Sequence, residues 1–196
     1  MTGLPMILTP DNEYAVLLDS SVLVPMPLCD LLLRLAEEPA LYRPLWSEQI
    51  LQEVGIALIN CLHHTETQRD RRLAFMRGSF PEALVSVPAD LPQAVSCIPD
   101  PGDRHVLAAA ISGRADAILT LNQRDFPKEC LEQWNIAGMS PDEFLEHQFH
   151  LSPEAVLDKI DAQASAIRNE RRQVIERLKQ RLQAPKFAAL IESRTS

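Results

Sequence analysis

The stretch DRHVLAAAISGRADAILTLNQRDFP, residues 103–127, predicts the fold of this chain. Its first half carries apolar residues at helical spacing, which predicts a helix that begins at Asp103 and stops at Gly113. Its second half holds a short apolar run, residues 117–121, typical of a strand buried on both faces. A helix followed at once by a buried strand indicates a parallel α/β sheet.

Polar side chains stand where these two elements meet loops. Asp103 opens the helix, and Asn122 and Asp125 follow the strand. In an open parallel sheet, ligands bind outside the carboxyl ends of the strands. We therefore expect other functional side chains to gather at this edge.

The rest of the chain continues the alternation of strands and helices. Pro44 indicates that the second strand is short or lies at an edge of the sheet. The predicted strands cover residues 14–18, 41–46, 83–87, 117–121 and 136–137, and the predicted helices cover residues 28–38, 48–60, 66–76, 91–97, 103–113 and 141–149. This order predicts the α/β class, with one domain over residues 1–150.

Residues 151–196 have a different pattern and are predicted to form a C-terminal helical arm. Apolar residues recur at steps of three and four between Ser152 and Pro185. One helix of about 30 residues would span roughly 45 Å. Its apolar stripe is narrow, so we expect it to pack on the body of the protein or on another subunit. A role in oligomerisation or partner binding is favoured over a disordered tail.

Composition sets further limits. The chain has 196 residues, 46% of them apolar, which is typical of a globular protein. No stretch of the sequence reaches membrane-spanning length, and residues 1–11 lack a basic region followed by an apolar one, so a cytoplasmic location is expected. The four cysteines have no close pairs, which argues against a zinc site and gives no disulfide framework.

The net charge of −8 is the wrong sign for a protein that coats duplex nucleic acid. Residues 152–196 carry nine basic and six acidic side chains, whereas residues 1–151 carry ten basic and twenty-one acidic ones. An acidic body with a basic tail fits a cation-filled pocket beside a phosphate-facing surface. It fits an ordinary acidic protein equally well.

Four acids fall at comparable places in the predicted fold: Asp19, Glu53, Asp103 and Asp125. Carboxylates crowded at one sheet edge repel one another and need protons or cations to coexist. Oxygen ligands select hard ions such as Mg²⁺ or Mn²⁺, and such a cluster suits phosphodiester hydrolysis. Each acid also has a plain explanation: Asp103 as a helix cap, Glu53 as a solvated helix residue and Asp125 as the start of a turn. Asp19, directly after a buried strand, needs a partner.

Four motifs in this order and spacing resemble the PIN domain, in the branch of the toxin ribonucleases of VapBC-type toxin–antitoxin pairs. They are LDSSVL (18–23), WSEQILQEV (46–54), DRHVLAAA (103–110) and ADAILTLNQRDFP (115–127), and the resemblance covers about residues 14–147. It implies a three-layer α/β/α fold and Mg²⁺- or Mn²⁺-dependent cleavage of single-stranded RNA. It also implies a homodimer and a small antitoxin that blocks the acidic pocket.

The resemblance also assigns site residues. Asp19 and Asp103 match the principal metal-binding acids, and Glu53 matches the acid in the helix after the second strand. The fourth acid of the family often stands where this chain has Asn122, which brings no charge. Asp125 is then the candidate for that carboxylate, and the second metal ion is in doubt.

Three alternatives remain open. A phosphatase of the haloacid-dehalogenase type also begins with an acid after a strand, but Ser21 stands where its second Asp belongs. A receiver-like signalling domain needs a lysine after the last core strand, and Lys128 comes only beyond residues 125–127. The third alternative is a PIN fold that has lost catalysis and serves as a binding scaffold. The departure at Asn122 supports it, and retention of the other acids argues against it.

Overall fold

A five-stranded parallel sheet forms the centre of the computed structural model, which describes residues 14–182 and 184–195. Residues 1–11, in which no leader is expected, lie outside the described part. The strand order is β3-β2-β1-β4-β5. The strands are β1 (Ala15–Leu18), β2 (Arg43–Ser47), β3 (Leu84–Val85), β4 (Ala117–Leu119) and β5 (Ala137–Met139).

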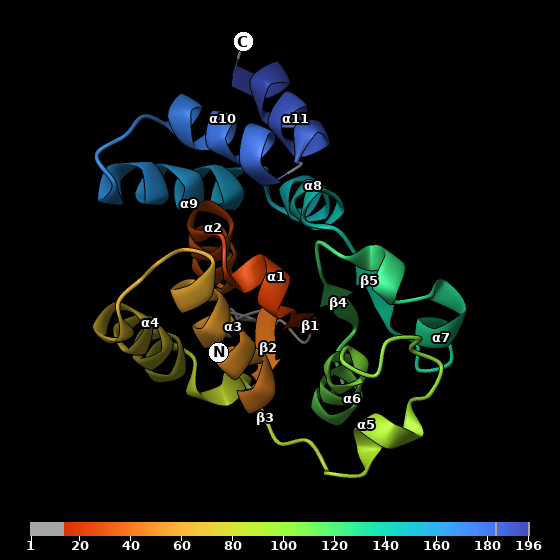
Figure 1. Ribbon diagram of the computed structural model, residues 1–196. Helices are drawn as coiled ribbons and strands as arrows, with labels where there is room; N and C mark the ends of the chain where they lie inside the picture. Colours follow the sequence, from red (N-terminus) through yellow and green to blue (C-terminus); the bar gives the residue numbers. More distant parts are fainter. Residues whose placement is uncertain (1–13, 183, 196) are drawn as a thin grey trace, which may run out of the picture.

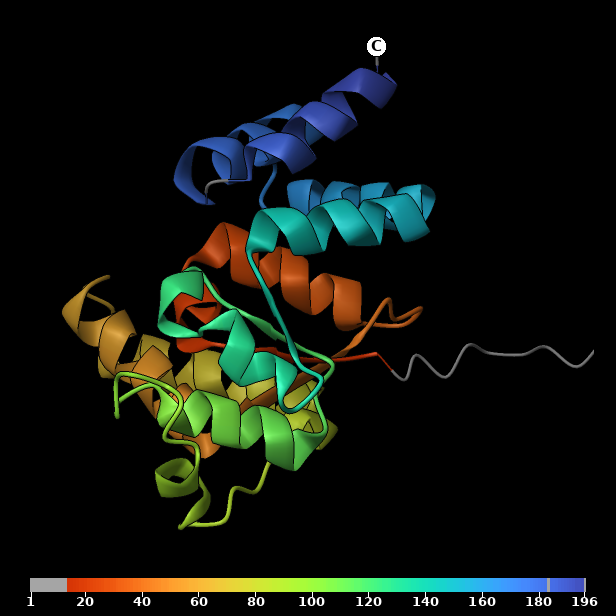
Figure 2. The same ribbon diagram turned by 90° about the vertical axis from the view of Figure 1, so that its right-hand side faces the viewer.

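Helices cover both faces of this sheet. The predicted helices correspond to α2 (Met26–Ala36), α3 (Glu48–Asn60), α4 (Glu66–Ser79), α5 (Leu91–Ala94), α6 (Arg104–Gly113) and α8 (Pro141–Leu151), and two unpredicted short ones are α1 (Ser20–Leu23) and α7 (Lys128–Glu132). Helix α2 lies on one face and α6 on the other (Figures 1 and 2). The three-layer α/β/α fold is thereby confirmed.

The topology places a crevice between β1 and β4. The connection from β1 to β2 runs through α2, whereas the connection into β4 runs through α6 on the opposite face. The loops that leave neighbouring strands β1 and β4 therefore diverge, and such a switch point is where ligands bind in open α/β sheets. Asp19 directly follows β1, and Asp103 precedes α6 at the same edge.

Pro44 predicted a strand that is short or lies at an edge, and the edge position is wrong, because β2 lies between β1 and β3. Arg43 donates its backbone N–H to Tyr14 on the β1 side, so the nitrogen of Pro44 faces the β3 side. Strand β3 pairs only with Trp46 and Ser47 and does not reach Pro44. The proline therefore removes no ladder hydrogen bond.

Helix α6 ends at Gly113, as predicted, but the residue in the left-handed conformation is Arg114, with φ 51°. A Cβ at Gly113 would lie 2.8 Å from Leu45 Cδ1 and 2.9 Å from Val85 Cγ2. The glycine is needed because α6 approaches β2 and β3 closely. It is not needed for the turn itself.

The prediction of a single long C-terminal helix is wrong. The segment forms three helices: α9 (Pro153–Ala166), α10 (Arg171–Leu182) and α11 (Pro185–Thr195). The first break follows from a left-handed residue, Arg168, with φ 52°, after which the chain reverses. Helix α10 then packs on α9 and α2, and α11 packs on α8 (Figure 1).

Specific contacts fasten these helices to the body. Lys159 donates to the carbonyls of Glu37 and Glu38 at the end of α2, at 3.0 and 3.3 Å. Buried Asp142 accepts the backbone N–H of Phe187 at 2.9 Å, which satisfies the start of α11. Most of the apolar stripe is thus buried within one chain, with Ile167 left exposed. The domain boundary at 150/151 and the role in oligomerisation stay predictions.

A disulfide joins Cys97 to Cys130, which corrects the expectation of no disulfide framework. Their separation of 33 residues gave no pattern that sequence reasoning could use. The bond ties the loop before Asp103 to α7, which follows Asp125. None of the helices in the described residues is long and apolar enough to cross a membrane.

Candidate functional site

Asp19 is the most buried of the predicted acids, with 6% of its surface exposed. Its Oδ2 accepts hydrogen bonds from Ser21 Oγ at 2.6 Å and from Thr120 Oγ1 at 2.8 Å. Its Oδ1 accepts only a longer bond from Ser20 Oγ, at 3.3 Å. The carboxylate is therefore held by hydroxyl groups on one oxygen, and the other oxygen has lone pairs to spare.

The backbone of the loop after β4 orients these hydroxyl groups. Ser21 Oγ accepts the N–H of Leu121, and Thr120 Oγ1 accepts the N–H of Asn122, both at 3.0 Å. A hydroxyl has one proton, and in this arrangement each proton is directed to Asp19. The loops after β1 and β4 are thus joined through the carboxylate of Asp19.

Asp103 precedes α6, but its side chain makes no capping hydrogen bond. Burial raises the pKa of the Asp103 carboxyl, and the negative charges of Asp125, Asp100 and Asp19 raise it further. The positive charge of His105 acts in the opposite direction. Helix capping therefore does not explain this residue, and its ionised form lies in an unfavourable, acidic environment.

Asp125 lies in an exposed 3₁₀ turn, Gln123–Asp125, just after β4. Among the neighbouring charges it has the largest effect on the pKa of Asp103. Asn122 takes part through its backbone N–H, and its side chain makes no capping bond. Between the two candidates for the fourth position, the electrostatics favour Asp125.

Glu53 lies in α3 and has a different partner. Its Oε1 lies 2.7 Å from Nε2 of His105, whose side chain is 6% exposed. The other ring nitrogen, Nδ1, is buried and has no hydrogen-bond partner in the described residues. His105 thus connects Glu53 to the first turn of α6.

The acids are close enough to influence one another but do not form a closed coordination shell. The charges of Asp125, Asp100 and Asp19 reach Asp103. Yet within the described ranges no three His, Cys, Asp or Glu side chains meet as a metal-binding group. The electrostatic effect and the missing closed group are compatible if the carboxylates are neighbours that move closer together when an ion binds. Their all-oxygen donor set, with no lysine or arginine in an ion pair with Asp19 or Asp103 in the described residues, fits a hard divalent cation.

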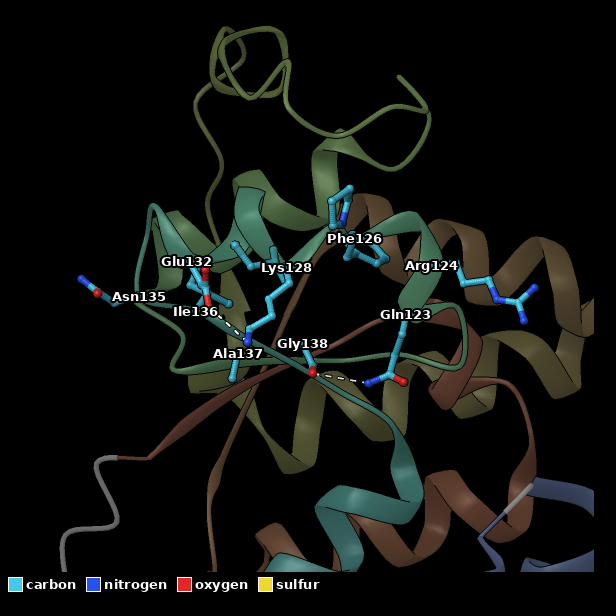
Figure 3. Close-up of a pocket in the computed structure, with 11 residues that line it drawn as sticks. Gln123, Arg124, Phe126, Lys128, Glu132, Asn135, Ile136, Ala137 and Gly138 are labelled. Atoms are coloured by element: carbon cyan, nitrogen blue, oxygen red, sulfur yellow. Dashed lines mark hydrogen bonds and ion pairs between the residues drawn. The ribbon is translucent and has the colours of Figure 1, made fainter.

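One cavity lies beside the turn that follows β4 and not at the acids. It measures about 750 Å³ and is lined by residues of the turn after β4, of α7 and of β5, including Gln123, Phe126 and Gly138 (Figure 3). Gln123 points to the carbonyl of Gly138, and Arg124 extends away from the other residues (Figure 3). None of the predicted acids lines it, so it is not the candidate active site.

Sequence reasoning missed three parts of the site. Ser21 and Thr120 carried only the signal that hydroxyl residues stand at strand ends. Asp100 sat in a turn, where Asp is common, and its Oδ1 does accept the N–H of Gly102 at 2.8 Å. The Glu53–His105 pair joins residues far apart in the chain, and such pairs leave no local pattern.

Comparison with known proteins gives two family matches. A family described as the PIN domain matches residues 15–124, and one described as the VapC50 C-terminal domain matches residues 141–193. A protein described as "Putative ribonuclease VapC50", from Mycobacterium tuberculosis, is 44% identical over 64 residues. That alignment covers 31% of this chain and 38% of the relative. No solved structure matches the chain.

Proposed function

Because the chain belongs to the PIN-domain family, we propose that it is a divalent-metal-dependent endoribonuclease, the toxin of a VapBC-type pair. The similarity of residues 141–193 to the VapC50 C-terminal domain supports the assignment to the VapC branch. One observation supports the proposal: buried Asp19 directly follows β1 at the crevice between β1 and β4, and its negative charge acts on Asp103, which has no lysine or arginine in an ion pair in the described residues.

We propose that Asp19, through Oδ1, and Asp103 hold one Mg²⁺ or Mn²⁺, with Asp125 as a further acid. When bound, such an ion lowers the pKa of water and stabilises the oxygen that leaves phosphorus. The chain's own contribution is orientation: Ser21 and Thr120 fix one oxygen of Asp19 and leave the other for a ligand. The mutual repulsion of the acids favours cation binding, because the positive charge of a cation offsets the negative charges of the carboxylates.

Glu53 stays in the proposed site as an acid whose orientation His105 sets. The 2.7 Å contact holds Glu53 Oε1 at the first turn of α6, near the segment that carries Asp103. A ligand-orienting partner of this kind is common around metal sites. Asn122 contributes through the backbone bond that orients Thr120.

Three of the four arginines of α4, Arg69, Arg72 and Arg77, have partners, which gives little support for a phosphate-binding surface there. Arg72 donates to the carbonyls of Leu23 and Val24, and Arg77 pairs with Glu48. We propose single-stranded RNA as the substrate because of the family and the acidic site. An antitoxin partner, a homodimer and a cytoplasmic location are proposed on the same resemblance.

The competing proposal is a PIN fold that binds without cleaving. The engagement of Glu53 by His105 favours it, as does the absence of a closed metal-binding group in the described residues. A phosphatase of the haloacid-dehalogenase type is not favoured, because Ser21 acts as a donor to Asp19 and supplies no second carboxylate.

One assay decides between cleavage and binding. The purified chain is incubated with an end-labelled RNA pool in Mg²⁺, Mn²⁺ or chelator, beside Asp19→Asn. Asp158→Asn, an exposed acid on α9, is the matched control. We expect metal-dependent cuts from the wild type and the control and none from Asp19→Asn. Cleavage that persists in chelator, or in Asp19→Asn, would refute the proposed site.

A further inference from the structure

A second cavity, of about 570 Å³, opens beside the acidic site at the same edge of the sheet. Its volume falls in the range of roughly 300–1,000 Å³ that is typical of small-molecule pockets. Its walls come from the end of β2, the start of α3, the loop after β3 and the first turn of α6. The lining includes Gln49, Leu84, Ser86, Val87, Pro88 and His105.

His105 connects this cavity to the proposed catalytic acids. It lines the cavity, and its Nε2 lies 2.7 Å from Oε1 of Glu53. A group bound in the cavity would therefore lie next to the acids. Within one RNA strand, the groups nearest to a scissile phosphate are the neighbouring sugars, bases and phosphates.

The chemistry of the walls selects among these groups. No lysine or arginine lines the cavity, as far as the described residues extend. Its acid, Glu48, is paired with Arg77 at 2.6 Å, and the imidazole of His105 already contacts Glu53 at 2.7 Å. Such a lining offers a phosphate no free counter-charge, which favours an uncharged occupant.

The remaining features fit a flat, partly apolar group with polar edges. Leu84, on the edge strand β3, exposes 46% of its surface, and Val87 and Pro88 extend this apolar surface. Gln49 and Ser86 add an amide and a hydroxyl that can read hydrogen-bonding edges. His105 contributes a buried Nδ1 that lacks a hydrogen-bond partner among the described groups.

We propose that this cavity binds one nucleobase of single-stranded RNA, in the nucleotide next to the phosphate that is cut. The inference rests on the proposed ribonuclease function and deepens it, because it makes the loop after β3 a determinant of base preference. Sequence-specific recognition of RNA commonly targets unstacked bases of single strands in this manner.

The test is a cycle between enzyme and substrate variants. Ser86→Trp fills the cavity from an exposed position, and Ser165→Trp makes the same change on exposed α9 as a control. The substrates are a fluorescent single-stranded oligoribonucleotide and a series in which one base at a time is replaced by hydrogen. Affinity is measured by anisotropy in chelator, and kcat/KM is measured in Mg²⁺.

We expect one position beside the cut at which loss of the base weakens binding to the wild type about five- to ten-fold, in the lower part of the range for base stacking. Ser86→Trp weakens binding of the intact RNA by the same factor and is insensitive to the base at that position. Ser165→Trp behaves as the wild type. Tm values confirm that each variant is folded.

Two results with Ser86→Trp would overturn the base site. The first is that the variant binds every RNA as the wild type does. The second is that the substitution weakens binding of intact and abasic RNAs equally, as a blocked protein-docking surface near the path of the strand would. A wild type that binds RNA with this base dependence but does not cut it in Mg²⁺ refutes the proposed ribonuclease function and leaves the base site standing. A wild type that binds no RNA refutes both.

Discussion

Replacing Thr120 by Val tests how Asp19 is held in place. The two side chains have nearly the same shape, and Thr120 is fully buried, so the substitution removes a hydroxyl with little change in packing. The lost contacts are the 2.8 Å hydrogen bond to Asp19 Oδ2, which leaves Ser21 as the donor to that oxygen, and the 3.0 Å bond that Thr120 Oγ1 accepts from the N–H of Asn122. Hydrogen bonds to charged groups contribute about 1.5–3 kcal/mol. We expect the free energy of unfolding to fall by about 2 kcal/mol.

In a protein of this size, such a loss lowers Tm by about 4–8 °C. Urea denaturation followed by circular dichroism gives the free energy directly, and Thr120→Ser, which keeps the hydroxyl, is the matched control. A double-mutant cycle with Asp19→Asn isolates the contact. Because the bond becomes neutral in that background, the cost of Thr120→Val should fall to about 1 kcal/mol.

Additive effects would refute this account. If Thr120→Val costs the same with Asp19 and with Asn at that position, the hydroxyl does not support the carboxylate. The account would also be refuted if Thr120→Val lowered the free energy of unfolding by no more than Thr120→Ser does. In either case the proposed division of Asp19 into one held and one ligand-binding oxygen fails.

Four further predictions follow from the same contacts. Asp125→Asn should lower the rate of RNA cleavage less than Asp103→Asn, which should abolish it; equal losses would make Asp125 a primary ligand. Asp103→Asn should also stabilise the metal-free protein at neutral pH. Because the pKa of Asp103 is higher in the folded than in the unfolded protein, the wild type loses stability as the pH rises from the unfolded pKa through the folded pKa. The Asp103→Asn variant should not show this loss of stability. The carboxyl is largely solvated, so the gain is at most about 1 kcal/mol, measured by Tm between pH 4 and 8. Reduction of the disulfide between Cys97 and Cys130, or Cys130→Ser, should cost about 2–4 kcal/mol of stability, and an unchanged Tm in reductant would argue that the bond contributes nothing. A chain that ends at His150 should lose stability and change its elution volume while it retains cleavage, because removal of α11 uncovers α8; an unaltered elution volume and Tm would leave the C-terminal helices without that role.

The parts of the site that sequence could predict are those that topology determines. Asp19 and Asp103 stand at a strand end and a helix start, and a parallel sheet brings such positions to one edge whatever the loops do. The apolar composition of the run before Asp19 predicts that this run is buried, and a buried carboxylate needs hydrogen-bonding partners. The identity of the donors could not be predicted, because Thr120 lies 101 residues from Asp19 in the sequence.

The predictions that failed depended on features that the local sequence pattern does not show. Pro44 is a sound edge signal, yet β3 is too short to require the missing N–H. The apolar spacing of the C-terminal segment holds within α9 and within α10, but the left-handed Arg168 lets the stripe fold back on itself. The pairing of Cys97 with Cys130 depends on how α7 lies against the loop before α6.

The proposed catalytic acids lie at positions that the sheet topology determines, whereas the proposed base cavity depends on a loop. The acids occupy the switch point between β1 and β4, and a shift there would disrupt the ladder that joins Asp19 to Leu119 at 3.1 Å. The base cavity instead depends on residues 84–92, which lie at the far side of β2 and pair with the sheet through two residues only. Changes in that loop can alter the cavity without moving Asp19 or Asp103. Substitutions there should therefore change which RNA is cut before they change whether RNA is cut, whereas substitutions at the switch point should do the reverse.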